Sequence, residues 1–574
     1  MPKRKSNSID SERPSRSNPS APRVFEYDER EEFINANIIP NADDSGESDS
    51  DISTNGNFED SSEDNSDSEQ VDNSTPTFTV HSYDDVYKSY SSSQKKLEND
   101  HQYKWLDGEY NHNRTFTNEI FLRKSDKESI LKSTPTNLFE CFFTLELKDY
   151  IIECIKRNGC EMSRTELDVF IGIIIFTTYN KRLSQRDYWS MDPHLRAEPI
   201  VSAKSRRRFE QIKSIIKFHK SEERNNTDRI YRVKKMTNIF RKNLMRNGIF
   251  STALSIDEMM LKFYGRTVLK QFIKGKPVTF GIKLWALCNA NGYIFDFEIY
   301  CGKNSDTDGV LSKCALGSRV AVNMLQVVFS IVSLRNRDRL HIYFDNLFTS
   351  PDLLIHLKNY GLCATGTVRE NRVGIKNSIQ KKDDRGKYEV KHDQNSGLNF
   401  LTVMDSKPVS ILSTAAEAVP IGPDLRRQKS LKDKRELDFP RAFLIYNKFM
   451  GGVDLHGQRC NKIGPIIRSK KWTWIIFIRL IQTSITNAVT VYNTANQGEG
   501  VKKSIKDFAM GVGKNYLSRS CKNSESSLHE TKQLLRMPCG YQGCKIRTRK
   551  FCSTCSMYYC GTCFKTAHPQ MDGI

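Results

Sequence analysis

Residues Leu340 to Ser350 read Leu-His-Ile-Tyr-Phe-Asp-Asn-Leu-Phe-Thr-Ser, an apolar strand-like run that ends on a carboxylate, Asp345. Two other acids occupy similar places, because Asp257 follows an apolar run that begins at Ala253 and Asp454 follows a Gly-Gly-Val turn. Buried strand ends disfavour unpaired charge, so carboxylates there usually bind a cation or transfer protons. Together the three aspartates would form an oxygen-rich site for Mg²⁺ or Mn²⁺. The same spacing also fits three unrelated turn or cap aspartates.

The segments between the first two acids favour the shared site. Residues 280–286 and 293–299 alternate between apolar and other side chains, as strands do, on either side of an Asn291-Gly292 turn signal. Apolar residues in 322–332 then fall on one helical face, before the strand that ends at Asp345. This order is typical of an RNase H-like layout, in which the strands of the first two acids lie side by side and a later helix brings the third. On a basic chain, such a site indicates phosphodiester chemistry on nucleic acid.

Several segments resemble the piggyBac transposase family in both their residues and their order along the chain. The resemblance runs from about Thr134 to the C-terminus, and it includes the Cys-rich tail. The motifs that carry it are Asp187–Ser190, Ser255–Glu258, Lys274–Lys283, Phe344–Ser350, Ala364–Arg369 and Tyr446–Asp454.

The resemblance implies a multidomain α/β protein. Its RNase H-like catalytic domain carries a β-rich insertion, is flanked by a split all-α DNA-binding and dimerisation domain, and is followed by a cross-braced zinc module. The expected boundaries are a disordered acidic region at 1–115, the helical domain at 116–252 and 464–530, the catalytic domain at 253–370 and 440–463, the insertion at 371–439 and the Cys-rich domain at 531–574.

The resemblance also implies a reaction. Two Mg²⁺ ions bound by Asp257, Asp345 and Asp454 would support hydrolysis and strand transfer at TTAA sites, on double-stranded DNA with terminal inverted repeats, by a homodimer. Many family members carry a further acid three residues after the third aspartate, where this chain has Gly457. Water could fill that place, but the loss puts enzymatic activity in doubt. A catalytically impaired, domesticated DNA-binding protein is therefore the alternative, and a RING-like ubiquitin ligase acting through the tail is a third class.

Charge is distributed unevenly along the 574 residues. The first 100 residues hold 10 Lys and Arg against 23 Asp and Glu, so the rest of a chain whose net charge is +20 carries +33. The acidic stretch 43–72 is expected to be disordered, either as a solvated tail or as a shield that competes with DNA for the basic body. Pro2–Lys5 is a candidate nuclear import signal, although short basic runs are often without function. No signal peptide is visible, and the apolar run Phe170–Phe176 is too short to span a bilayer, so we expect a soluble nuclear protein without a membrane partner.

Cysteines crowd the C-terminus. Of the 15 in the chain, nine are scattered and are expected to be buried or free thiols, while six lie in the last 36 residues and are followed by His568. Paired cysteines at close spacing are a zinc signature, and seven ligands imply two Zn²⁺ ions, with a disulfide cluster as the alternative. In the cross-braced scheme implied by the resemblance, one ion takes Cys539, Cys544, Cys560 and Cys563. The other takes Cys552, Cys555 and His568, with His529 as the candidate eighth ligand or a solvated loop residue.

Basic residues near these regions are candidate DNA contacts. Arg206, Arg207 and Arg208 precede an apolar helical face, where they suit either a DNA-facing surface or a soluble helix edge. Trp472 follows a basic run and could stack on an exposed base or pack on the core. The other candidates are Arg468, Lys470 and Lys471 before this tryptophan, and Lys545, Arg547 and Arg549 between the zinc ligand pairs.

Overall fold

The computed structural model describes most of the chain beyond its first 100 residues. It covers residues 101–567, apart from gaps at 121, 123, 226, 247–250, 275–277, 303–314, 333, 428–433, 497–499, 501, 523–530, 542 and 553–556. The acidic stretch 43–72 and the basic run Pro2–Lys5 lie outside the described residues, so the roles expected for them stay predictions.

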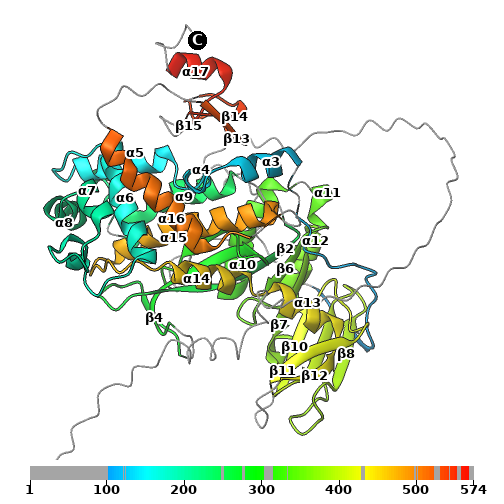
Figure 1. Ribbon diagram of the computed structural model, residues 1–574. Helices are drawn as coiled ribbons and strands as arrows, with labels where there is room; N and C mark the ends of the chain where they lie inside the picture. The colour runs from blue at the N-terminus through cyan, green and yellow to red at the C-terminus, as the bar shows by residue number, and fades with distance from the viewer. Residues whose placement is uncertain are drawn as a thin grey trace, which may run out of the picture. The chain divides into compact units, whose positions relative to one another are not determined.

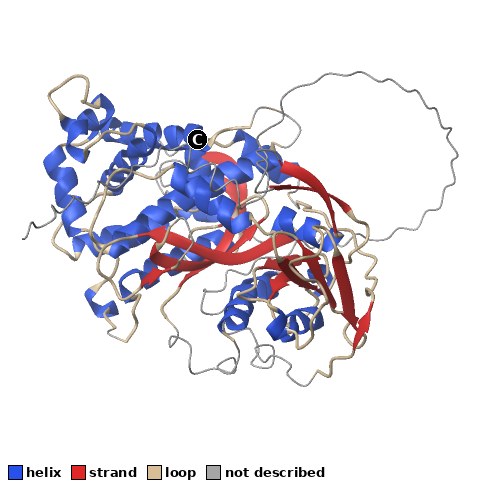
Figure 2. Ribbon diagram, turned by 90° about the horizontal axis from the view of Figure 1, so that it is seen from below, coloured by secondary structure: helices blue, strands red, loops and turns tan. Residues whose placement is uncertain are grey.

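A large mixed sheet forms the centre of the described chain (Figures 1 and 2). Strand β2 (Ala253–Lys262) pairs in parallel with β6 (His341–Phe344) and antiparallel with β4 (Phe280–Asn289). Strand β5 (Ile294–Ile299) pairs with β4, and β7 (Cys363–Val368) pairs in parallel with β6. The strands that carry or precede the first two acids are therefore neighbours, which confirms their predicted placement.

Turn and cap residues fix the connections around these strands. Gly292 has a φ of +76° in the β4–β5 turn, as the Asn-Gly signal predicted. Helix α12 (Pro351–Asn359) begins where the Ser350 side chain accepts a hydrogen bond from the Leu353 N–H, and it is followed by Gly361 at φ +79°. Helices α10 (Leu316–Ile331) and α11 (Leu334–Arg337) lie between β5 and β6 in the sequence.

Residues 371–439 extend the central sheet. Strand β10 (Pro408–Ser413) pairs with β7, then β9 (Asn399–Met404) with β10, and β8 (Tyr388–Asp393) with β9. The β-rich character predicted for this stretch is present, but these three strands are hydrogen-bonded to the sheet that holds Asp257. The pair β11 (Gly422–Arg427) and β12 (Lys434–Phe439) forms a separate two-stranded sheet.

The predicted disordered region 1–115 is wrong for its last residues. Strand β1 (Trp105–Asp107) pairs with β8, and the Asp393 carboxylate accepts hydrogen bonds from the Lys104 N–H at 2.6 Å and a His101 ring nitrogen at 2.8 Å. The prediction failed because it extended the acidic composition too far. The segment 101–116 is rich in aromatic side chains, and Trp105 packs against Phe400 with ring centroids 6.0 Å apart.

Helices from two distant stretches pack together. Helix α15 (Trp472–Ala495) contacts α3 and α4, and α16 (Ile505–Ser518) contacts α4 and α6; Figure 1 draws the later pair in orange among blue and cyan helices. The contact is close, since a Cβ on Gly172 of α6 would lie 2.8 Å from the Tyr516 Cβ of α16. The earlier helices are α3 (Lys124–Lys132), α4 (Pro135–Glu140), α5 (Leu145–Lys156), α6 (Arg164–Tyr179), α7 (Glu198–Ala203), α8 (Arg206–Ile215) and α9 (Tyr231–Met245), with 3-10 turns at Gln185–Trp189 and Ser221–Glu223.

A buried network of charges joins these helices. The Lys148 ammonium lies 2.9 Å from a Glu140 oxygen and 2.8 Å from an Asp168 oxygen, and Arg519, just after α16, pairs with both acids. The Tyr516 hydroxyl donates to Glu140 at 2.9 Å. Burial raises the pKa of a carboxyl, but the charges of Lys148 and Arg519 prevail and hold the pKa of Glu140 well below its usual range. Two acids and two bases thus neutralise one another inside the helical core.

One helix, α15, is long and apolar enough by length and composition to cross a membrane, and 94% of its most apolar window is buried inside the fold. The apolar run Phe170–Phe176 lies in α6, where all seven residues are buried.

Substituting Lys148 should test the buried network. Lys148→Met keeps the length of the side chain and leaves two buried acids with one basic partner, so we expect a loss of about 3–5 kcal/mol in the free energy of unfolding. Lys156→Met on the same helix is the matched control, because its side chain is 47% exposed and its pair with Glu161 should contribute at most about 1 kcal/mol. Urea unfolding followed by circular dichroism measures both, and equal losses would contradict the assignment.

Candidate metal centres

Asp257 and Asp345 lie at the same level of two neighbouring parallel strands. Ile256 of β2 is in register with Phe344 of β6, so the residue that follows each one is an aspartate. Asp257 is 8% exposed and Asp345 is half-buried. The Leu347 N–H donates to Asp345 Oδ1 at 2.8 Å, and the Glu258 N–H donates to Asp257 Oδ1 at 2.7 Å. These backbone hydrogen bonds orient both carboxylates.

Asp454 lies in the first turn of α14 (Gly452–Lys462), which is packed closely against the end of β4. A Cβ on Gly452 would lie 2.1 Å from the Asn289 carbonyl oxygen and 2.8 Å from the Ser255 hydroxyl, so only glycine fits there. Downstream, a His456 ring nitrogen lies 2.9 Å from the Gly292 carbonyl oxygen, and Arg459 donates to the Asn291 carbonyl at 2.6 Å. The β4–β5 turn therefore fixes the helix that carries the third acid.

Tyr446 lies within electrostatic reach of all three carboxylates. This residue belongs to α13 (Arg441–Phe449), and its hydroxyl lies 3.4 Å from the Thr367 hydroxyl. Burial raises the pKa of Tyr446, and the negative charges of Asp345, Asp257 and Asp454 raise it further. The motif Tyr446–Asp454 gives no sign of this position for Tyr446, because a sequence motif does not say which way a helical side chain points.

The donor set fits a hard divalent cation. Carboxylate oxygens from a strand, a strand end and a helix start are ligands that Mg²⁺ and Mn²⁺ prefer. Within the part of the chain that the structure describes, three ligand atoms within 4.8 Å of one another occur in a cysteine cluster and not among these aspartates.

The residues that follow Asp454 supply no fourth carboxylate. His456 is fully buried and faces Gly292 and Thr483 with its two ring nitrogens, at 2.9 and 3.2 Å, so it is directed into the core. Gly457 stands one helical turn from Asp454, and a Cβ there would meet no atom within 4 Å. The position has room for the missing acid.

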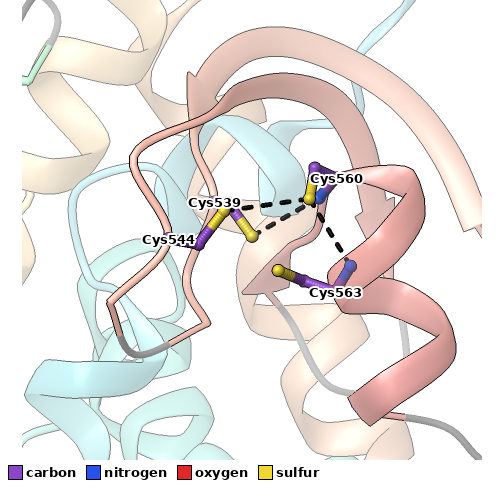
Figure 3. A group of neighbouring side chains, drawn as sticks. All are labelled: Cys539, Cys544, Cys560 and Cys563. Carbon is purple, nitrogen blue, oxygen red and sulfur yellow. Dashed lines mark hydrogen bonds between the residues drawn. The ribbon is translucent and has the colours of Figure 1, made fainter.

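Four cysteines near the C-terminus form a second candidate centre (Figure 3). The sulfur atoms of Cys539, Cys544, Cys560 and Cys563 all lie within 4.8 Å of one another, and those of Cys544 and Cys560 are 3.8 Å apart. Zn–S bonds of about 2.3 Å in a tetrahedron place two sulfurs about 3.8 Å apart, so the cluster fits a structural zinc ion. These are the four residues that the cross-braced scheme assigned to one ion.

Short strands and one helix position these thiols. The sheet of β13 (Thr531–Pro538), β14 (Arg547–Cys552) and β15 (Met557–Tyr558) precedes α17 (Gly561–Ala567). The Cys560 N–H points to the Cys539 sulfur at 3.4 Å, an arrangement that favours thiolate ligands. Of the residues predicted to hold the second ion, Cys552 is buried in β14, whereas Cys555, His568 and His529 lie outside the described residues.

The predicted DNA contacts on α8 divide into two kinds. Arg206 and Arg207 are exposed and, with Trp189 and Glu210, line an open hollow of about 510 Å³. Arg208 instead binds Glu166, with its Nε and Nη2 each 2.8 Å from a carboxylate oxygen. Those hydrogen bonds lower the pKa of Glu166 to about 2. Arg208 therefore stabilises the fold rather than presenting its charge to a ligand.

The basic run before α15 also contains both exposed residues and a residue that is hydrogen-bonded within the fold. Arg468 and Lys470 are exposed, whereas the Lys471 ammonium donates to the carbonyl oxygens of Ser214 and Ile216 at 2.5 and 3.3 Å. Trp472 is only 9% exposed and belongs to the main apolar core. Of the two roles weighed for this tryptophan, the geometry supports packing.

In the tail, Lys545 is exposed, and Arg547 and Arg549 of β14 are half-buried. The Arg549 guanidinium lies 3.7 Å from an Asp126 oxygen. Cysteines elsewhere, such as Cys141, Cys154 and Cys288, are buried free thiols, as predicted.

Comparison with known proteins assigns the chain to a family. A family model described as transposase IS4 matches residues 134–489, more than half of the chain. Human piggyBac transposable element-derived protein 3 is 28% identical over 374 residues, which make up 63% of this chain and 62% of that protein. The chain belongs to the piggyBac-type transposase IS4 family. This confirms the resemblance found in the sequence.

Other piggyBac-type proteins also match this chain. Human piggyBac transposable element-derived protein 2 is 28% identical over 368 residues, 62% of this chain and 61% of that protein. The matches thus span about three fifths of these relatives' own lengths. A solved piggyBac transposase synaptic complex with hairpin DNA matches with a TM-score of 0.56 and 22% identity, over 68% of this chain and 82% of that chain. That likeness shows a shared fold.

Metal analysis should test the cysteine cluster. Replacing Cys560 or Cys563 with serine removes a thiolate from a four-sulfur set, so we expect each variant to lose about one zinc ion per chain. Cys154→Ser is the control, because Cys154 is a buried thiol far from the cluster in the sequence. Plasma mass spectrometry of the purified full chain gives the count. Unchanged zinc in both cluster variants would refute the assignment.

Proposed function

We propose that this piggyBac-type protein is a DNA transposase in which Asp257, Asp345 and Asp454 are the catalytic carboxylates. The observation that supports this most directly is the placement of the three acids. Asp257 and Asp345 follow residues that are in register on β2 and β6, and Asp454 lies in the first turn of α14, whose Gly452 packs against Ser255 of β2 and Asn289 of β4. The strand order β5-β4-β2-β6-β7 supports an RNase H-like catalytic domain, since it brings the first two acids side by side.

The chain's own residues would hold and orient the reacting groups. The three aspartates would bind two Mg²⁺ or Mn²⁺ ions, which supply an activated attacking oxygen and stabilise the leaving oxygen of an in-line displacement. Backbone N–H groups orient Asp257 and Asp345, and Gly452 lets α14 approach close enough to bring Asp454 to them. Such a pre-organised set does not need to rearrange during the reaction.

Double-stranded DNA is the proposed partner. The chain beyond residue 100 carries +33, and exposed basic residues such as Arg206, Arg207 and Lys470 can neutralise backbone phosphates. The structurally similar piggyBac transposase was solved with hairpin DNA, which supports a hairpin intermediate here. We extend the proposal to terminal inverted repeats, joining at TTAA, a homodimer held by the helical stretches and a nuclear location.

A second function is favoured by Gly457. The open space beside this residue holds no carboxylate, so one ion would have fewer protein ligands than in relatives that carry the acid. The alternative is therefore a domesticated DNA-binding protein that retains the fold and the zinc module but cuts DNA slowly or not at all.

Replacing each aspartate with asparagine should separate cleavage from binding. Asp257→Asn, Asp345→Asn and Asp454→Asn keep the shape but remove the charge that balances a cation, so we expect cleavage to fall by about a thousandfold with DNA affinity nearly unchanged. Asp107→Asn, whose side chain is 89% exposed, is the control. Excision is measured on donor DNA that carries the flanks of this gene's own locus. Full cleavage by any one variant would remove that residue from the catalytic set.

Restoring the fourth acid should raise activity. Gly457→Asp places a carboxylate one helical turn from Asp454 in space that is free of other atoms, so we expect cleavage in Mg²⁺ to rise about tenfold or more, from a weak starting level. Gly457→Asn is the matched control, with the same shape and no charge. If the unaltered protein excises its element efficiently and Gly457→Asp adds nothing, three carboxylates suffice and the impaired alternative is excluded.

A further inference from the structure

Two phenylalanines stand exposed at one edge of the large sheet. Strand β3 (Lys270–Phe272) is the last strand in the order, and it pairs with β4 so that Phe272 lies opposite Phe280. Their side chains are 60% and 39% exposed, and their ring centroids are 4.8 Å apart. Exposure of aromatic rings to water is energetically unfavourable. A pair of exposed rings is therefore typical of a surface that binds a ligand.

The pair projects from the same sheet face as Asp257. Residues opposite each other in an antiparallel pair point to the same side, and side chains alternate along a strand. Asp257 is opposite Ala286, Met259 is opposite Leu284 and Leu261 is opposite Ile282, in an unbroken register. Two residues beyond Ile282, Phe280 points to that same face, and Phe272 points with it.

The surroundings of the pair are basic. Between Glu258 and Asp296 the sequence holds no acid. Lys270 of β3 lies opposite Ile282 on the same face as the rings and is exposed, and Lys274 is exposed two residues after Phe272. An apolar surface for a protein partner would not need such one-sided charge, whereas a polyanion with flat apolar rings matches both features.

We propose that Phe272 and Phe280, with Lys270 and Lys274, form a platform that binds unpaired nucleotides of a DNA strand. Base faces stack on exposed aromatic rings, and lysines neutralise the neighbouring phosphates. The inference rests on the proposed DNA function and names a substrate form for it. Phe280 lies opposite Phe263, six positions after Asp257, which is about 20 Å along the strand direction and about six nucleotides at B-form spacing.

Anisotropy titrations of the full-length protein with a fluorescein-labelled single strand of about 20 nucleotides and with the matching duplex test the platform. Replacing both phenylalanines with alanine should weaken single-strand binding about tenfold or more while duplex binding changes less than about twofold. The Phe272→Tyr and Phe280→Tyr double variant, which keeps both rings, should restore single-strand binding. Lys270→Gln with Lys274→Gln should weaken both and flatten the salt dependence.

A matched control separates stacking from general loss of exposed apolar surface. Leu183→Ala with Met191→Ala removes two side chains that are 104% and 88% exposed in another part of the chain, and it should leave both affinities unchanged. Unchanged single-strand affinity in the double alanine variant would overturn the proposal. So would an equal loss for both DNA forms, or a changed oligomeric state with DNA binding intact, which would indicate a contact with a second copy.

The platform and the proposed catalysis can fail separately. If the unaltered protein cleaves no DNA but the double alanine variant still loses single-strand affinity selectively, the platform stands and the catalytic proposal does not. If the unaltered protein cleaves DNA yet does not bind the single strand, the platform is wrong and the catalytic proposal stands.

Discussion

The contact between Gly452 and the Asn289 carbonyl is the constraint on which the candidate active site depends. A side chain at that position would collide with the backbone at the end of β4, so a glycine is required for α14 to lie against the sheet. His456 and Arg459 then bind the carbonyls of the β4–β5 turn, which holds the helix in one orientation. This packing holds the first turn of α14, which carries Asp454, against β2 and β4. It also explains why the motif Gly451–Asp454 has a glycine at position 452.

The acidic side chains of this fold have two kinds of surroundings. Where an acid is buried in the helical region or beneath α9, a basic group meets it, as Lys148 meets Glu140 and Arg241 meets Asp296. Such pairs balance the cost of removing charge from water. Beside the central strands β2 and β6, the fold instead places three acids within electrostatic reach of one phenol, Tyr446. An arrangement that adds like charges is expensive for stability, which is why we interpret it as a site selected for binding a cation.

Much of this arrangement could be predicted from the sequence, because local patterns carried it. The alternating runs around Asn291-Gly292 and the strand before Asp345 identified the strands, and Ser350-Pro351 marked the start of α12. The spacing of the tail cysteines indicated a zinc site, and the family scheme grouped four of them as the structure does. Non-local facts escaped: the pairing of β1 with β8 and the ion pair between Arg208 and Glu166 depend on partners far along the chain. Charge and aromaticity gave no warning of those partners. For Trp472 the sequence left stacking and core packing open, and the structure shows that it is buried.

The union of helices from both ends of the chain has a consequence for synthesis on the ribosome. Asp168 and its partner Arg519 are separated by 351 positions, and Lys148 and Glu140 share the same network. At a translation rate of about 5–20 residues per second, the early helices wait roughly 20–70 s for the arginine to emerge. During that interval their acids and apolar faces lack the later helices, so the helical core is completed only after the C-terminal part of the chain has been synthesised. A message truncated before Arg519 yields a chain in which Glu140 and Asp168 lack one of their two basic partners.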